Sequence, residues 1–346
     1  MKRLSLFDPT YVLIKGLPFV HEDYLARIPK EKMAEISREN KALEWLSYHL
    51  SGGILCFETT ANQLSFEIMY ANEPLMNHMS PLGESGFDLY VFDQNEFIFF
   101  DSIRPFPRQK EIRISIDLPQ DKPVKIMMYT PLYARVISAH VHLEDDDLLK
   151  PYDPEFLGSM LWYGTSITQG ACASRPGMSY TNQLSRSMHM EMINLGFSGN
   201  GLGELSIARV THDINHLDAI IIDYEANAGA VGKLKDTLIP WIKVVREKHP
   251  FIPVIIISRI PFTREKWINE DRNKRMMHHL FQKEVVHNEK DLQPLYFIDG
   301  KTLIHNDETD VTVDGIHLND VGMTLFAKRL KECFKDFKIL SDKIKV

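Results

Sequence analysis

Three residues that could share one reaction stand far apart in the chain. Ser166 lies in Trp162-Tyr-Gly-Thr-Ser-Ile-Thr168 at the end of an apolar run, and Asp314 and His317 stand three residues apart in Asp-Gly-Ile-His. A serine hydroxyl is a weak nucleophile at neutral pH and needs an adjacent base that a third group orients. Residues three apart can face each other on one helical turn, where Asp314 would fix the imidazole tautomer. The order Ser, Asp, His predicts a serine hydrolase.

Two further segments could supply donors to a developing oxyanion. Residues 193–201 read as a strand end that runs into a Gly-rich loop, and residues 220–227 as a buried strand whose exit loop carries an asparagine. A hydrolase needs donors aimed at the oxygen that becomes negative in the transition state. The predicted oxyanion hole consists of the backbone N–H of Ser166, the backbone N–H of Gly199 and the side-chain amide of Asn227.

These residues carry a resemblance to a known family. Ser166, Gly199, Asn227 and His317 match, in order, the four blocks that name the SGNH (GDSL-type) hydrolases, and Asp314 completes the last block, Asp-x-x-His. The resemblance implies a flavodoxin-like three-layer α/β/α fold. It also implies hydrolysis of esters or thioesters without a metal or an organic cofactor.

The resemblance covers roughly residues 155–340 and departs from the family pattern at two places. Thr165 replaces the aspartate before the nucleophile, and Glu225-Ala226-Asn227 replaces the usual Gly-x-Asn-Asp. Farther upstream, Gly86-Phe-Asp-Leu-Tyr90 matches the Gly-x-Asp-Leu-Tyr signature of a segment that precedes the catalytic domain in one SGNH subgroup.

The C-terminal half of the chain alternates strand-like and helical segments. We predict strands at Gly158–Tyr163, Met190–Leu195, Ala219–Tyr224, Pro253–Ser258 and Leu295–Ile298, and helices at about 178–188, 202–215, 231–247, 264–288 and 319–338. Such alternation is typical of a parallel sheet with helices on both faces. Sites in these sheets lie beyond the carboxyl ends of the strands. The first three strands would therefore bring their motif residues to one edge.

The N-terminal half is rich in short strands that turns separate. We predict strands at Gly53–Phe57, Leu64–Tyr70, Phe87–Phe92, Phe97–Asp101, Glu111–Asp117, Val124–Thr130 and Val136–Leu143. Alternation of apolar and polar residues within them is the signature of half-buried strands, so we predict a β-sandwich. A short helix is expected within residues 30–48. The acidic, proline-bounded stretch Glu144–Pro154 reads as a linker between domains at 1–150 and 151–346.

Composition limits the classes of partner. The chain has 346 residues, a net charge of −7 and 44% hydrophobic residues, which suits a globular protein and argues against nucleic acid as a partner. No segment approaches the ~20 apolar residues of a membrane span. No secretory signal is visible at the N-terminus, so a cytoplasmic location is expected. Three widely spaced cysteines suit reduced thiols better than a disulfide framework.

Each site residue also has a purely structural interpretation. Ser166 could cap a helix, Gly199 could permit a tight turn, and Asn227 could form an Asx-turn. Asp314 and His317 could cap and begin the last helix. The active-site interpretation is favoured because all five residues occur together, in the family order, with three of them at predicted strand ends.

Other features give weaker hypotheses. Cys172 and Arg175 follow the nucleophile closely and are candidates for the substrate pocket, although a buried thiol and a surface loop cation are the simpler interpretations. Gly199-Asn-Gly-Leu-Gly203 imitates a dinucleotide-binding turn, but its spacing is Gly-x-Gly-x-Gly. His140 and His142 share one strand face, where a surface or core pair is favoured over a metal site.

The predicted reaction is hydrolysis of a short acyl ester, with an O-acetyl group on a carbohydrate as first choice. This choice follows from the resemblance and from the β-sandwich, which together resemble carbohydrate esterases. Acyl transfer, lipase and thioesterase activities would use the same residues, and a glycan-binding protein with a decayed site is disfavoured because every catalytic position holds a competent residue. The sequence leaves the oligomeric state open.

Overall fold

The computed structural model describes residues 1–119 and 123–339. The chain forms two compact units. The sandwich unit contains residues 1–30, 47–156 and 174–177, and the parallel-sheet unit contains residues 31–46, 157–173 and the chain from Met178 onward. Each unit thus includes a short segment from the opposite half of the chain.

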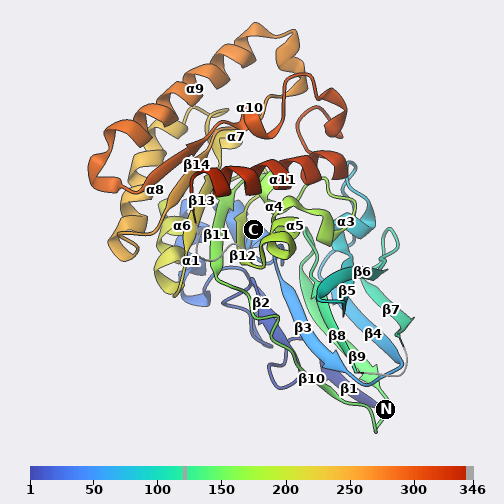
Figure 1. The fold of residues 1–346 in the computed structure, drawn as a ribbon. Coiled ribbons are helices and arrows are strands. Elements are labelled where there is room, and N and C mark those ends of the chain that lie inside the picture. Colours follow the sequence, from blue (N-terminus) through green and yellow to red (C-terminus); the bar gives the residue numbers. More distant parts are fainter. Residues whose placement is uncertain (120–122, 340–346) are drawn as a thin grey trace. The chain divides into compact units, whose positions relative to one another are not determined.

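The sandwich unit consists of two antiparallel sheets (Figure 1). The first has the order β1-β9-β4-β7 and the second β10-β3-β8-β5-β6, with β2 paired to β3. Their bounds are β1 Lys2–Ser5, β2 Leu13–Lys15, β3 Ile54–Thr59, β4 Gln63–Tyr70, β5 Phe87–Asp93, β6 Glu96–Ile103, β7 Glu111–Asp117, β8 Val124–Tyr129, β9 Val136–Leu143 and β10 Leu149–Pro151. The short helix α3 (Pro81–Ser85) precedes β5.

The two sheets share one hydrophobic core. Leu64, Phe66 and Ile68 alternate along β4 and are buried in the same cluster as Leu55 and Phe57 of β3 in the other sheet. The apolar residues at every second position of β4 therefore all face the core, as expected for a half-buried strand. The predicted β-sandwich is confirmed.

Three short strands escape sequence analysis. β1, β2 and β10 have only three or four residues, too few for an alternating pattern to stand out. β10 lies inside the predicted linker, where Leu149–Pro151 pairs antiparallel with Phe57–Thr59 of β3. The second half of that acidic stretch is therefore part of a sheet and not a free connection.

The parallel-sheet unit contains a five-stranded sheet with the order β12-β11-β13-β14-β15. This is the doubly wound order of flavodoxin-like folds, and it confirms the predicted class. The strands are β11 Ser159–Gly164, β12 Glu191–Gly196, β13 Ala219–Asp223, β14 Val254–Ile257 and β15 Leu295–Ile298. The helices are α1 Met33–Glu39, α2 Lys41–Ser47, α4 Ser166–Gln169, α5 Tyr180–Met188, α6 Leu205–Val210, α7 Glu225–Ala228, α8 Leu234–Lys248, α9 Asn269–Asn288, α10 Gly300–Leu303 and α11 Asp320–Asp336.

Helices cover both faces of the sheet because its central strands are apolar on both sides. Every residue of β11 is buried. Trp162 packs edge-on against Tyr180 of α5 and Phe334 of α11, while its neighbour Tyr163 stacks on Trp241 of α8 with ring centroids 4.8 Å apart. The continuous apolar run predicted at this strand is the form that a two-sided buried strand requires.

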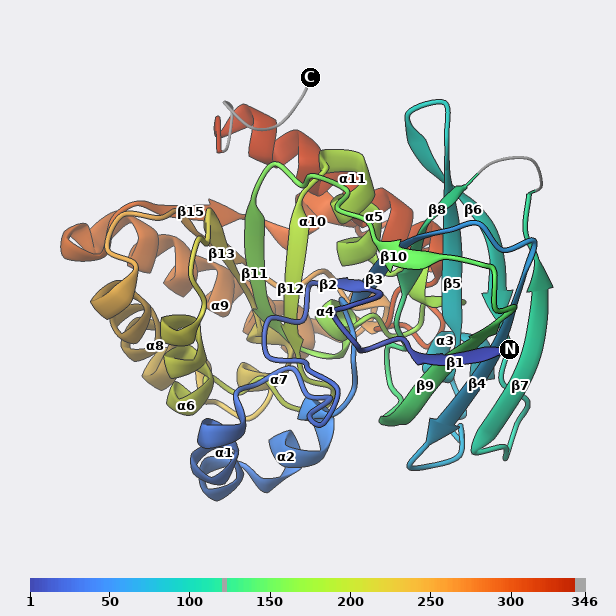
Figure 2. The ribbon, with the colours of Figure 1, turned by 90° about the horizontal axis from the view of Figure 1, so that it is seen from below.

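Residues from the N-terminal half complete this unit. Glu39, at the end of α1, accepts hydrogen bonds from the backbone N–H groups of Leu205 (3.0 Å) and Ser206 (2.8 Å). A carboxylate is stabilised there because the first N–H groups of a helix lack partners within the helix. Figure 2 shows α1 beside α6. Among the described helices, none is long and apolar enough to cross a membrane.

Candidate active site

The carboxyl ends of three neighbouring strands lie level at one edge of the parallel sheet. The last residue of β11, Gly164, pairs in register with the last residues of β12 and β13. Ser166, Gly199 and Asn227 follow those three strands within four residues. The sheet register therefore brings all three motif residues to the same edge.

Ser166 is the first residue of the one-turn helix α4. The residue is 8% exposed, and its Oγ lies 2.9 Å from Nε2 of His317. The helix N-cap position belongs to Thr165, whose backbone is extended. The capping interpretation of Ser166 is therefore wrong, and its hydroxyl is placed to give a proton to the imidazole.

Asp314 holds the other side of the imidazole. Its Oδ2 accepts from Nδ1 of His317 at 2.7 Å, and its Oδ1 accepts from the backbone N–H groups of His317 (2.8 Å) and Ile316 (3.1 Å). Burial by itself raises the pKa of the Asp314 carboxyl, but the hydrogen bonds from His317 outweigh it, so the net pKa is lowered. The carboxyl is therefore ionised at neutral pH.

The turn that joins Asp314 to His317 is not helical, contrary to our prediction. Both residues lie in a loop before α11 that is closed by a bridge between Thr312 and Leu318. Gly315, inside this loop, has φ +85°, a left-handed conformation that an α-helix does not contain. The three-residue spacing is satisfied by a tight loop, which sequence spacing alone does not distinguish from a helical turn.

The last helix begins after this loop. Its N-cap is Asn319, whose side chain accepts from the N–H of Gly322 at 3.1 Å. The interpretation of Asp314 and His317 as cap and first residue of that helix is therefore wrong.

Gly199 presents an open backbone donor. Its φ is +66°, and a Cβ built on it would meet no atom within 4 Å. Within residues 1–119 and 123–339, no group accepts a hydrogen bond from its N–H. At Gly201, by contrast, a Cβ would come 2.4 Å from the carbonyl oxygen of Gly164. Gly201 is thus required by close packing on the end of β11. This packing explains the glycine without a dinucleotide-binding turn.

One of the two amide N–H groups of Asn227 holds its side chain in place. It lies in α7, and its Nδ2 donates to the backbone carbonyl of Asn200 in the loop that carries Gly199. A primary amide has two N–H groups, so the second remains for another acceptor. The sequence could not predict this contact with Asn200, because every residue type has a backbone carbonyl.

Cys172 lies beside the Asp314 loop. Its backbone N–H donates to the carbonyl of Leu318 at 3.1 Å. Burial, and to a lesser extent the charge of Asp314, raises the pKa of its thiol to about 12. The thiol is therefore neutral at pH 7, and its contact with substrate stays a prediction.

Arg175 belongs to the sandwich unit, where it is held by the Gly-x-Asp-Leu-Tyr signature. Its Nη1 donates to Asp88 Oδ2 and to Tyr90 OH, both at 2.8 Å, and its guanidinium lies 3.8 Å from the ring centroid of Phe99. Asp88 Oδ2 also accepts from the backbone N–H of Gly177 at 2.7 Å. The signature thus binds a chain segment that follows the nucleophile by eight residues. A contact between Arg175 and substrate stays a prediction.

The weaker metal hypothesis has a simpler explanation. His142 Nε2 lies 3.6 Å from a carboxylate oxygen of Glu67 on the adjacent strand β4. That carboxylate also accepts from Arg3 at 2.7 Å. His142 therefore belongs to a charged surface cluster on the first sheet.

Two protein-family models match this chain. Residues 159–335, just over half of it, match the GDSL-like lipase/acylhydrolase family. The chain belongs to this family. Residues 7–149 match the N-terminus of SGNH-hydrolase-type esterases, whose signature is the one that binds Arg175. A GDSL-like chain of this kind is an ester hydrolase of the SGNH type. A search of curated proteins gave no match.

Several solved structures share the architecture over the whole chain. A Bacteroides ovatus protein described as a GDSL-like lipase is 27% identical, covers 100% of this chain and 99% of its own, and has a TM-score of 0.88. A salicylyl-acyltransferase from a tetracycline biosynthetic pathway is 19% identical, with 98% of each chain covered and a TM-score of 0.77. An acetyl xylan esterase from Butyrivibrio proteoclasticus is 10% identical, with 97% and 99% covered and a TM-score of 0.58. The last two show a common fold.

Proposed function

We propose that this GDSL-like chain is a serine esterase in which Ser166 is the nucleophile, His317 the general base and Asp314 the residue that orients it. One observation carries the proposal: an unbroken line of contacts runs from Ser166 Oγ through both imidazole nitrogens to the Asp314 carboxylate. With Nδ1 donating to Asp314, Nε2 has a lone pair for the serine proton. This is the geometry that activates a serine hydroxyl.

In the first half-reaction, Ser166 Oγ attacks the ester carbonyl carbon while its proton passes to His317 Nε2. The carbonyl oxygen becomes negative and accepts hydrogen bonds from the Ser166 and Gly199 N–H groups and from the second N–H of Asn227. When the tetrahedral intermediate collapses, its bond to the leaving oxygen breaks. His317 gives its proton to the departing alcohol, and an acyl-serine remains.

In the second half-reaction, water takes the place of the alcohol. His317 accepts a proton from the attacking water, the same donors meet the oxyanion, and the acid leaves as Ser166 recovers its proton. The Asp314 carboxylate stabilises the imidazolium in both halves. The chemistry needs no metal and no organic cofactor.

For the substrate, we propose a short acyl ester on a carbohydrate, with O-acetyl first. The support is the shared two-part architecture of this chain and the acetyl xylan esterase, which extends over nearly all of both chains. Acyl transfer is the second candidate because a salicylyl-acyltransferase has the same architecture over 98% of both chains. The two reactions share the acyl-enzyme and differ only in whether water or another hydroxyl group attacks it.

The nucleophile is tested by Ser166→Ala. We expect the variant to lose turnover of p-nitrophenyl acetate while its thermal unfolding stays close to that of the wild type, because the hydroxyl serves chemistry and not packing. A fluorophosphonate probe should label the wild type once, at Ser166. Full activity in the alanine variant, or labelling at another residue, would overturn the assignment.

Substrate and acceptor are tested in one screen. p-Nitrophenyl esters of increasing acyl length are compared with acetylated xylo-oligosaccharides, each with and without an added sugar alcohol as acceptor. We expect the highest kcat/KM for acetyl esters and release of free acetate. Acyl sugar alcohol as the main product would favour transfer, and a maximum at long acyl chains would exclude the short-ester proposal.

A further inference from the structure

The chain has a buried carboxylate two residues before Asn227, where the family pattern usually has glycine. The Glu225 side chain has no exposed surface. Its Oε2 accepts from the backbone N–H of Arg259 at 2.8 Å. Its Oε1 lies 3.8 Å from Arg259 Nε and 3.5 Å from His278 Nδ1, too far for strong hydrogen bonds. Burying such a charge is costly unless the surroundings compensate it.

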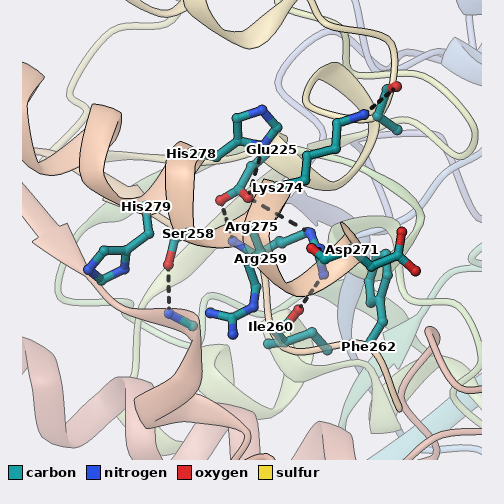
Figure 3. A network of polar contacts seen from close by, with 12 residues as sticks. Glu225, Ser258, Arg259, Ile260, Phe262, Asp271, Lys274, Arg275, His278 and His279 are labelled. Carbon is teal, nitrogen blue, oxygen red and sulfur yellow. Dashed lines mark hydrogen bonds and ion pairs between the residues drawn. The ribbon is translucent and has the colours of Figure 1, made fainter. Parts of the chain in front are cut away.

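The compensation is a chain of alternating charges. Figure 3 shows where it begins, with Glu225 beside His278 and Arg259. The Arg259 guanidinium stacks over the ring of Phe262, 4.1 Å from its centroid, and donates to Glu265. The other oxygen of Glu265 accepts from Arg275 Nε at 2.8 Å. These side chains are at most 9% exposed, so each charge depends on its neighbours and not on water.

This chain of charges connects elements that are distant in sequence. Glu225 lies in α7, Arg259 follows β14, and Arg275 and His278 lie in α9. The imidazole of His278 also packs on Gly229 at the end of α7, where an added Cβ would come 2.6 Å from the ring. One side of the short helix α7 is therefore fixed by charge and by close packing.

The other side of α7 is fixed by Asn227 itself. Its Nδ2 donates to the Asn200 carbonyl in the Gly199 loop. A helix of four residues has too few internal hydrogen bonds to define its own orientation. The direction of the free amide N–H therefore depends on both attachments, one through Asn227 and one through Glu225.

We propose that Glu225 is a positioning residue that aims the Asn227 amide at the oxyanion. The inference rests on the proposed function, because it requires Asn227 to be an oxyanion donor. Glu225 would not touch the substrate; it would act through α7 alone. Its loss should therefore lower kcat and leave KM nearly unchanged, since the donor matters most when charge develops on the oxygen.

The test is a double-mutant cycle on the full chain with p-nitrophenyl acetate. Glu225→Gln keeps the shape and an acceptor for the Arg259 N–H but removes the charge. We expect kcat to fall on the order of ten-fold, a fraction of what complete loss of an oxyanion donor costs. In the Asn227→Ala background, the same substitution should lower kcat by less than about two-fold, because the group through which it acts is gone.

Glu308→Gln is the matched control. Glu308 accepts from Arg329 Nη1 at 2.6 Å and from Nη2 at 2.7 Å, and this ion pair lies outside the chain of charges around Glu225. We expect a fall in melting temperature with a kcat within about two-fold of the wild type, because breaking the pair destabilises the unit without releasing α7. If Glu308→Gln lowers kcat as much as Glu225→Gln, general softening explains both results and the proposal is overturned.

The remaining outcomes also decide the question. Additive effects of Glu225→Gln and Asn227→Ala overturn the positioning role, and so does an Asn227→Ala variant with unchanged kcat. If Glu225→Gln does not fold, Glu225→Asp, one methylene shorter but still charged, must show the same dependence on Asn227. Ser166→Ala, measured in parallel, isolates the proposed function: if it retains activity, the hydrolase mechanism itself has failed.

Discussion

At the scale of single residues, the proposed oxyanion hole combines two kinds of donor. The Gly199 N–H is fixed by the backbone of its loop, whereas the Asn227 amide is set by a side chain that already uses one of its N–H groups. A fixed donor costs no reorganisation during the reaction. The contact to Asn200 gives Asn227 part of the same advantage.

Asn227→Ala removes the side-chain donor. We expect kcat for p-nitrophenyl acetate to fall on the order of 10²–10³-fold, or about 3–4 kcal/mol, with little change in KM. Asn273→Ala, at an exposed position of α9, is the control and should keep the kcat of the wild type. A large rise in KM with kcat preserved would instead make Asn227 a substrate-binding residue.

Asp223 has an unusual ionisation at the end of β13. Burial raises the pKa of its carboxyl to about 7, and the carboxyl accepts from the hydroxyl groups of Thr168 (3.2 Å) and Tyr180 (3.4 Å). The unfolded chain ionises this group near pH 4, so the folded state binds the extra proton between about pH 4 and 7. This contribution to stability is intact below pH 4 and is lost as the pH rises through 7.

Asp223→Asn should therefore stabilise the protein in a pH-dependent way. The gain in unfolding free energy should approach about 4 kcal/mol at pH 8 and be clearly smaller at pH 5. Urea unfolding at both pH values measures it, with Asp236→Asn, at an exposed position of α8, as the control. A gain that is equal at pH 5 and pH 8 would show that Asp223 does not titrate in this range.

At the scale of elements, sequence periodicity was a good guide to long segments and a poor one to short ones. The five strands of the parallel sheet lie within one or two residues of their predicted bounds, because each is a buried apolar run between turns. The prediction of a helical turn between Asp314 and His317 was wrong, because the spacing of the two residues does not reveal the left-handed conformation of Gly315. The anchoring of Asn227 by Asn200 and Glu225 was not predicted, since it depends on contacts between separate loops.

The same limit applies to the Gly-x-Asp-Leu-Tyr signature. The signature is visible in the sequence, but its partner, Arg175, is 85 residues or more away in the chain. Asp88 is fully buried and serves Arg175, Gly177 and Ser102 together. A motif that looks local thus fixes a distant segment of the same unit.

Asp88→Ala should destabilise the sandwich unit strongly. It leaves the half-buried Arg175 guanidinium without its carboxylate and the buried Gly177 N–H without its acceptor, a loss of about 3 kcal/mol or more. Asp101→Ala, which removes the carboxylate partner of the exposed Arg104 from the adjacent strand β6, should cost less than about 1 kcal/mol. Urea unfolding of both variants checks the contrast, and equal losses would contradict the anchoring role of Asp88.

At the scale of the whole molecule, a cut near residue 150 does not separate the two units. The parallel-sheet unit includes residues 31–46, and the sandwich unit includes residues 174–177. Within the former, Asn40 Nδ2 donates to Glu204 Oε1 (2.8 Å) and to Asn200 Oδ1 (2.9 Å). The same Asn200 holds Asn227 through its carbonyl.

A chain that begins at Tyr152 should therefore be defective even though it retains every proposed catalytic residue. It lacks α1 and Asn40, and its Ser174–Gly177 segment has lost Asp88 and Tyr90. We expect aggregation in size-exclusion chromatography, or non-cooperative thermal unfolding with reduced kcat. A soluble, monodisperse product with the activity of the full chain would show that residues 31–46 and the signature are dispensable.

The early position of residues 31–46 in the chain also has a consequence for folding during synthesis. Residues 31–46 are made more than a hundred residues before β11, the first strand of their own unit. Their packing surface, α6, begins at Leu205, about 160 residues after residue 46, so at about 5–20 residues per second they wait roughly 8–32 seconds for it. The seven residues of α1 bury only Ile36 and are too few to form a stable helix alone. We therefore expect this segment to stay unfolded in the nascent chain until α6 and the parallel sheet have been made.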